Sequence, residues 1–354
     1  MRKAFPSIIC AVLLVFLPVS LIWGQTGQAG SDPKTELVKV LDNIKAIDAE
    51  MVKATEAKDR ETYDKLADKR QKLEERAKAL KAEVDALAAD SKTLAEAKKE
   101  YNDGGSQLRS GNYPEAVKHY KRSLELDPGN ANTQYNLGVA YLKMKQSADA
   151  RKAFLKATEV NPDYAAAYLA LGNIEAKDRE DDLALKYYRQ AIALDSTMEK
   201  AYFGVGNIHF RKIEFAQAVE AYAKAVAIDP KFDEAWTALG RSFSGLNQLE
   251  EALKALDRAV VVNKKSDDAL YYQAEVFNKL GRYADALKAA ETSLTYRKTD
   301  KAPVYFEKGV ALAKLGRKSD ALKAFEEVKQ DRAWRESAQY QIDVLNGKLK
   351  PTEP

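Results

Sequence analysis

Small and aromatic side chains recur along most of this chain with a period of 34 residues, from about residue 97 to about residue 335. One period contains Leu137, Gly138, Tyr141, Ala150, Phe154, Ala157 and Pro162. The glycine returns at Gly172, Gly206 and Gly240, and the alanine returns at Ala184, Ala218 and Ala252. A spacing this regular predicts a helical solenoid, in which each repeat packs against the next.

The periodic part of the chain divides into seven units. These are 97–130, 131–164, 165–198, 199–232, 233–266, 267–301 and 302–330. Residues 102–105 include two adjacent glycines, so the first helix of the first unit is expected to be degenerate. One residue is inserted in the loop 297–303, and a loop absorbs an insertion at little cost. A one-sided helix at 331–346 is expected to cap the last repeat, ahead of a disordered tail at 347–354.

Two amphipathic stretches without repeat character occupy residues 35–96. The first spaces its apolar residues three and four apart, and the second carries leucines at intervals of seven: Leu66, Leu73, Leu80, Leu87 and Leu94. The heptad phase slips by one position across a polar segment, which favours an antiparallel helical hairpin that turns near residues 58–60. The alternative is one long helix that oligomerises as a coiled coil through its leucines.

The beginning of the chain predicts export. In residues 1–24, two basic residues precede an apolar run that ends in small and polar residues, as in a signal peptide. The alternative is a membrane anchor at residues 7–23, although this run is short for a span. A polar linker follows at 25–34, and the only cysteine, Cys10, lies within the leader. We therefore expect a protein without thiols in the periplasm or cell envelope.

The recurring residues resemble the signature of the tetratricopeptide repeat family over roughly two-thirds of the chain. The layout is similar to that of exported bacterial members with a coiled-coil segment ahead of the repeats. The resemblance implies an all-α fold: a superhelical solenoid of about seven helix-turn-helix repeats with a capping helix, preceded by an amphipathic hairpin or coiled coil. It also implies that Gly138, Ala150 and their equivalents let paired helices cross closely, while aromatic side chains fill the space between helices.

The resemblance further implies a groove lined by the first helices of the repeats. Its candidate partner-binding residues are Tyr101, Asn102, Tyr135, Asn136, Lys143, Asn173, Lys177, Lys200, Phe203, Asn207, Phe210, Arg211, Arg241, Tyr271, Tyr272, Asn278 and Phe306. Asn102 and Asn136 resemble the start of an asparagine ladder that holds a peptide backbone in some relatives, but the ladder is broken in later repeats. The carboxylate clamp of chaperone-binding relatives has no counterpart, because Tyr101 and Gly105 stand at its positions.

Composition and charge narrow the range of functions. Apolar residues make up 45% of the chain and charged residues 31%, as expected of a mostly helical soluble protein. The net charge of +4 is spread along the sequence, which argues against a nucleic-acid partner. His119 and His209 are isolated, and no nucleophile motif or phosphate-binding loop is present. We therefore expect no catalytic residue, no metal site and no cofactor.

Two functions are consistent with these features. The first is a non-catalytic protein–protein interaction scaffold of the periplasm or cell envelope, whose groove binds an extended peptide or a helix of an unidentified protein partner. The second is an oligomeric structural envelope protein that self-associates through the leucine-heptad helix within 35–96. In either case, contact with the membrane is expected only through an uncleaved amino-terminal segment.

Overall fold

The computed structural model describes residues 32–350, which form two compact units that divide between Ala95 and Glu96. These residues contain sixteen α-helices and no strand, so the predicted all-α repeat fold is confirmed. None of the described helices is both long enough and apolar enough to cross a membrane. The predicted leader at 1–24 and the alternative anchor at 7–23 lie outside the described residues, as does the end of the predicted tail.

The first unit is a helical hairpin. It consists of α1 (Pro33–Glu56) and the first part of α2 (Arg60–Arg109), which are joined at residues 57–59. Two ion pairs connect the helices: Arg76 with Glu36 at 2.8 Å, and Arg70 with Asp48 at 2.6 Å. The later residue of α2 pairs with the earlier residue of α1, so the two helices run antiparallel.

The core of the hairpin is small. Val40, Ala77 and Leu80 are buried between the helices. Asp32 caps α1 by accepting hydrogen bonds from backbone amides of the first turn, so the helix includes the last two residues of the segment predicted as a linker.

The first helix of the first repeat is continuous, although its sequence at residues 102–105 departs from the repeat signature. The helix α2 continues without interruption through residues 102–105. Gly104 lies under the ring of Tyr120 in α3 (Tyr113–Leu126), where an added Cβ would be 2.8 Å from Cε1 of the ring. Glycine is a poor helix former, but the packing of Tyr120 requires a small residue at this point.

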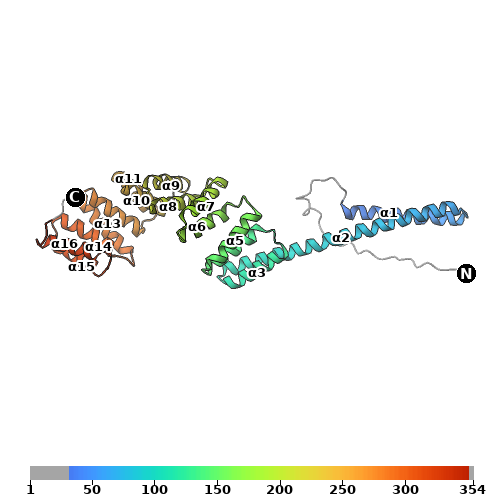
Figure 1. The fold of residues 1–354 in the computed structure, drawn as a ribbon, viewed down its shortest axis with the longest axis horizontal. Coiled ribbons are helices and arrows are strands. Elements are labelled where there is room, and N and C mark those ends of the chain that lie inside the picture. The colour runs from blue at the N-terminus through green and yellow to red at the C-terminus, as the bar shows by residue number, and fades with distance from the viewer. Residues whose placement is uncertain (1–31, 351–354) are drawn as a thin grey trace. The chain divides into compact units, whose positions relative to one another are not determined.

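The second unit continues as one pair of helices per repeat (Figure 1). The first helices are α4 (Ala131–Lys143), α6 (Ala165–Lys177), α8 (Glu199–Arg211), α10 (Asp233–Gly245), α12 (Asp267–Lys279) and α14 (Ala302–Lys314). The second helices are α5 (Ser147–Val160), α7 (Asp181–Leu194), α9 (Phe215–Ile228), α11 (Leu249–Val262), α13 (Tyr283–Tyr296) and α15 (Lys318–Val328). The last helix, α16 (Arg335–Leu345), packs on α15 and buries Ala338 and Ile342 against Phe325.

In most repeats a bulky side chain of the second helix lies directly on a glycine of the first. The pairs are Gly138–Phe154, Gly172–Tyr188, Gly206–Tyr222, Gly240–Leu256 and Gly309–Phe325, and in each an added Cβ would come within 2.6 Å of the opposing side chain. The repeat alanines, such as Ala150 and Ala218, are fully buried nearby. The prediction that small residues allow the paired helices to cross closely is therefore confirmed.

The repeats pack more closely on one side of the stack than on the other. Successive first helices contact one another from α6 to α14, in addition to the contacts within each repeat. Across the described repeats, second helices have no contacts of similar extent with each other. Closer packing on one side curves a stack of repeats, so the first helices form its inner wall and the second helices its outer wall.

The inserted residue lies between α13 and α14, where Arg297 fixes the loop. The side chain of Arg297 is 8% exposed and forms ion pairs with Asp267, at 3.2 Å, and with Asp268. It also donates a hydrogen bond to the backbone carbonyl of Asp300. The helix α14 still packs on α12 and α13, so the stack remains continuous across the insertion.

Replacing Gly206 with alanine should destabilise the second unit, whereas replacing Gly105 should not. Both residues lie inside helices, where alanine is favoured over glycine by about 1 kcal/mol. The new methyl group would meet Tyr222 at 2.6 Å in the first variant, while its nearest neighbour in the second is 3.5 Å away. We expect urea unfolding to show that the free energy of unfolding falls by about 1–3 kcal/mol in Gly206→Ala and rises slightly in Gly105→Ala. Equal effects of the two substitutions would contradict the proposed steric role.

Candidate functional site

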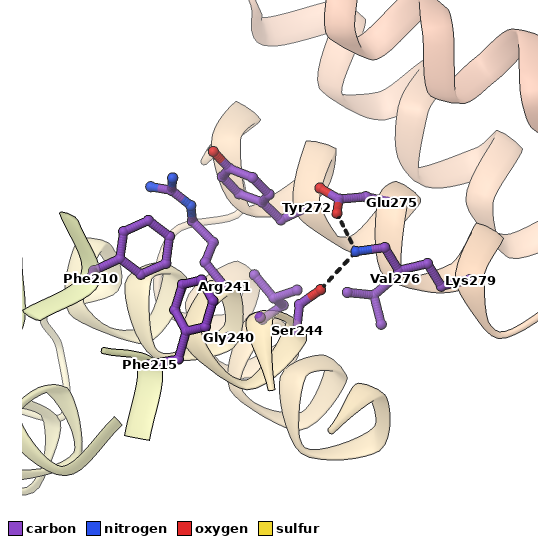
Figure 2. A pocket seen from close by; sticks show the side chains of 11 residues that line it. Phe210, Phe215, Gly240, Arg241, Ser244, Tyr272, Glu275, Val276 and Lys279 are labelled. Atoms are coloured by element: carbon purple, nitrogen blue, oxygen red, sulfur yellow. Dashed lines mark hydrogen bonds and ion pairs between the residues drawn. The ribbon is translucent and has the colours of Figure 1, made fainter. Parts of the chain in front are cut away.

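A hollow of about 210 Å³ lies on the inner wall, among the three repeats between residues 199 and 301 (Figure 2). Its polar and aromatic lining consists of Phe210, Phe215, Arg241, Ser244, Tyr272, Glu275 and Lys279. We call it the Arg241 pocket. Pockets for drug-sized molecules usually measure about 300–1,000 Å³, so this one suits a single side chain or a small group.

The pocket lies at a repeat where the core residue is smaller than usual. Leu256, which lines the pocket, occupies the position that holds Tyr188 and Tyr222 in the two preceding repeats. Leucine has no ring and no hydroxyl group to extend toward the inner wall. Leu256 and Gly240 both line the hollow, which therefore lies at the repeat with the smaller core residue.

The guanidinium of Arg241 is held between two aromatic rings. Its central carbon lies 4.6 Å from the ring centroid of Phe210 and 4.6 Å from that of Tyr272 (Figure 2). The three side chains come from α8, α10 and α12, which are successive first helices in contact with one another. Phe215 supports this arrangement, since its ring centroid is 5.4 Å from that of Phe210. Contacts of this kind orient the cation and leave its edge accessible.

Lys279 is the second cation in the pocket, and it is already paired. Its ammonium group lies 2.6 Å from the carboxylate of Glu275 and 3.1 Å from the hydroxyl of Ser244 (Figure 2). Glu275 neutralises Lys279, whereas no carboxylate within residues 32–350 pairs with Arg241. The pocket therefore carries one net positive charge.

A half-buried carboxylate, that of Glu307 in α14, lies beside this pair. Glu307 accepts a hydrogen bond from the side-chain amide of Asn278 at 2.8 Å, and the same amide donates to the backbone carbonyl of Glu307 at 2.9 Å. Burial raises the pKa of Glu307 to about 7; the hydrogen bond from Asn278 lowers it, and Glu275 raises it further. The charge of Glu307, which lies outside the lining of the pocket, therefore changes near neutral pH.

Asn173 and Asn207 are each tied to a tyrosine of their own repeat. The hydroxyl of Tyr188 donates to Oδ1 of Asn173 at 2.8 Å, and that of Tyr222 donates to Oδ1 of Asn207 at 2.7 Å. Burial raises the pKa of both tyrosines, so their hydroxyls remain donors. Both asparagines are exposed, and their amide nitrogens remain available to donate to a ligand. Asn136 differs, because its amide donates to the hydroxyl of Tyr101.

Three predicted groove residues, Tyr135, Phe203 and Phe306, are half-buried in aromatic clusters. Each ring contacts two others. One belongs to the second helix of the same repeat and lies on that repeat's glycine; the other belongs to a residue just after the second helix. The clusters are Tyr135 with Phe154 and Tyr164, Phe203 with Tyr222 and Phe232, and Phe306 with Phe325 and Trp334. These rings therefore stabilise the repeats as well as forming part of the wall.

The remaining predicted residues are spread along the first helices. Arg211 forms an ion pair with Asp181 of the preceding repeat. Tyr271 packs against Tyr272, with ring centroids 4.6 Å apart. Asn102, Lys143, Lys177 and Lys200 are exposed.

Of the predicted residues, the structure brings Phe210, Arg241 and Tyr272 together in one pocket. The residues that sequence analysis missed are Phe215, Ser244, Glu275 and Lys279. Three of these stand at the ninth, twelfth and thirteenth positions of their repeats, where the candidates Asn173, Phe210 and Lys177 stand in theirs, so repeat position could have found them. Phe215 begins the second helix α9, whereas the candidates were sought on first helices only.

Comparisons with known proteins identify the repeats. Family models described as tetratricopeptide repeat match residues 107–175, 165–198, 199–232, 237–303 and 280–338. No curated protein matches this chain.

Several solved structures are similar to the chain. One is that of pilF from Pseudomonas aeruginosa, with 17% identity and a TM-score of 0.54, covering 63% of this chain and 99% of that chain. Another is a tetratricopeptide repeat protein from Parabacteroides merdae, with 13% identity and a TM-score of 0.51, covering 71% and 99% of the two chains. YrrB, described as a TPR protein with an unusual peptide-binding site, has 25% identity and a TM-score of 0.48, covering 56% and 100%. The first two similarities show the fold alone.

Replacing Glu307 with glutamine should stabilise the protein at high pH only. The carboxyl group ionises near its usual pKa of 4.5 in the unfolded chain but at about 7 in the folded protein, so stability falls as pH rises from about 4.5 to about 7. Glutamine keeps an acceptor for Asn278 without the charge. In urea unfolding we expect the free energy of unfolding of Glu307→Gln to be about 1–2 kcal/mol higher than that of the wild type at pH 8. At pH 5 the two values should be equal. The same difference at both pH values would contradict this account.

Proposed function

Because the chain belongs to the tetratricopeptide repeat family, whose members bind protein or peptide partners, we propose that it is a non-catalytic protein–protein interaction scaffold. The Arg241 pocket is the observation that supports this proposal most directly. Three successive repeats contribute to its walls, so a ligand that follows the inner wall from repeat to repeat would pass over it. The ligand would be an extended peptide or a helix of a partner protein.

The inner wall offers contacts that suit a peptide. The exposed amides of Asn173 and Asn207 stand one period apart and can donate to backbone carbonyl groups, whatever the side chains of the ligand. The rings of Phe210 and Tyr272 offer apolar contact next to a fixed cation. A site of this composition combines backbone recognition with selection of one side chain.

We further propose that the scaffold works in the periplasm or cell envelope. The support for this location is the signal-like sequence of residues 1–24 and the lack of any cysteine after it. An uncleaved leader would instead keep the protein at the membrane through residues 7–23.

Photo-crosslinking in intact cells tests the scaffold function. A photoreactive amino acid at Lys177 or Lys279, on first helices, should form covalent adducts with a partner, and mass spectrometry would identify that partner. The matched control is the same amino acid at Lys254, which is exposed on the second helix α11. Adducts that form equally well from Lys254 would contradict binding on the inner wall.

A second candidate function is self-association through the leucine seam of α2. Leu87 and Leu94 are 44% and 59% exposed, while Leu80, on the same seam, is 1% exposed against α1. Exposed leucines at heptad spacing are the residues that a coiled-coil partner would bury. This observation favours a structural role for the hairpin in addition to binding by the repeats.

Light scattering on the purified protein tests self-association. If the leucine seam is an interface, the wild type should have the mass of an oligomer, and the double substitution Leu87→Gln with Leu94→Gln should give a monomer. Val52→Gln, at a site 57% exposed on α1, is the matched control and should leave the oligomer intact. A monomeric wild type would eliminate this candidate.

A further inference from the structure

The guanidinium of Arg241 is fixed in position but has no anionic partner within residues 32–350. The rings of Phe210 and Tyr272 each have their centroid 4.6 Å from its central carbon, so its N–H groups are the part that remains to bind a polar ligand. These donors lie in one plane and match the two oxygens of a carboxylate. We propose that Arg241 binds a carboxylate of a peptide held on the inner wall, an inference that rests on the proposed scaffold function.

Other partly buried arginines of the same stack are neutralised by the protein itself. Arg151 lies 2.7 Å from Glu175 and 2.6 Å from Asp178, and Arg211 pairs with Asp181. Arg241 is also half-buried, yet its charge is left to solvent and to the two rings. A cation that has lost part of its hydration binds an incoming anion more readily than a fully hydrated one.

The charge of the pocket selects the type of anion. Arg241 and Lys279 contribute two positive charges and Glu275 one negative charge, so a single carboxylate neutralises the site. A phosphate dianion would leave an excess negative charge close to Glu275. The volume of about 210 Å³ accommodates an acidic side chain together with a few waters, at about 30 Å³ for each water.

The apolar part of the lining favours a carboxylate on a hydrocarbon stem. Phe210, Phe215, Leu256 and Val276 surround the space beside the guanidinium. Methylene groups of a glutamate or aspartate would contact these residues while the carboxylate reaches Arg241. The free carboxyl terminus of a peptide is a second source of the same group.

Selection from two peptide libraries on the intact purified chain tests the proposal. One library joins each peptide to its carrier through the carboxyl end, so only acidic side chains are available; the other leaves the carboxyl terminus free. We expect the selected peptides to carry an acidic residue in the first library, or a required free terminus in the second. Replacing that residue by glutamine, or amidating that terminus, should weaken binding about tenfold or more.

A double-mutant cycle assigns the effect to Arg241. Arg241→Gln should weaken binding of the acidic peptide to the same extent, and should cause no further loss with the glutamine or amidated peptide. Arg241→Lys, which keeps the charge without the planar group, should give an intermediate loss. Arg258→Gln, at an exposed site on α11, is the matched control and should bind like the wild type. Circular dichroism and thermal melting of each variant show that the fold is retained.

The outcomes separate the two proposals. If peptides bind without a carboxylate requirement, or bind Arg241→Gln as tightly as the wild type, this inference is overturned while the scaffold function stands. If neither library yields a peptide that binds, the peptide-binding function and the inference both fail.

Discussion

The fold of the second unit depends on one recurring contact, in which a bulky side chain of the second helix occupies the space above a glycine of the first. At Gly172 and Gly206 there is no room for even a single methyl group beneath the tyrosine ring. The contact sets the separation of the paired helices, and the buried alanines keep it short. The stacking of repeats, and with it the curvature that creates an inner wall, follows from hairpins of uniform thickness.

The same contact connects the core to the binding surface. A tyrosine that lies on its glycine carries its hydroxyl to the inner wall, where it holds Asn173 or Asn207 in place. In the next repeat both members of this arrangement change, since leucine replaces the tyrosine and Arg241 replaces the asparagine. The smaller core residue leaves a hollow, and the longer wall residue extends between the rings of the adjacent repeats. The replacement of a core tyrosine by leucine therefore accompanies the replacement of an asparagine on the inner wall by an arginine, which can bind a different group of a ligand.

The sequence predicts the repeats well because each hairpin buries its own signature residues at fixed spacing. It predicts the pocket less well, because the pocket depends on how side chains from three repeats meet. Phe210, Arg241 and Tyr272 were each candidates, but nothing in their spacing shows that two rings enclose one cation. The hydrogen bonds between Asn278 of α12 and Glu307 of α14 join two repeats, and local sequence does not reveal them. The contact of Gly104 with Tyr120 likewise depends on the packing of α3 against α2, which the low helix propensity of glycine does not reveal.

Arg297 has a consequence for how such an array can change in evolution. Arrays of this kind grow and shrink by whole units, and a stray extra residue would normally disturb the alignment of every unit that follows. Here two aspartates at the start of α12 anchor the arginine of the enlarged loop, so the irregularity is confined to one junction. The residues that line the pocket all lie before that junction, so changes in the chain after α14 need not alter them. The length of the array can therefore vary while the lining of the pocket is kept.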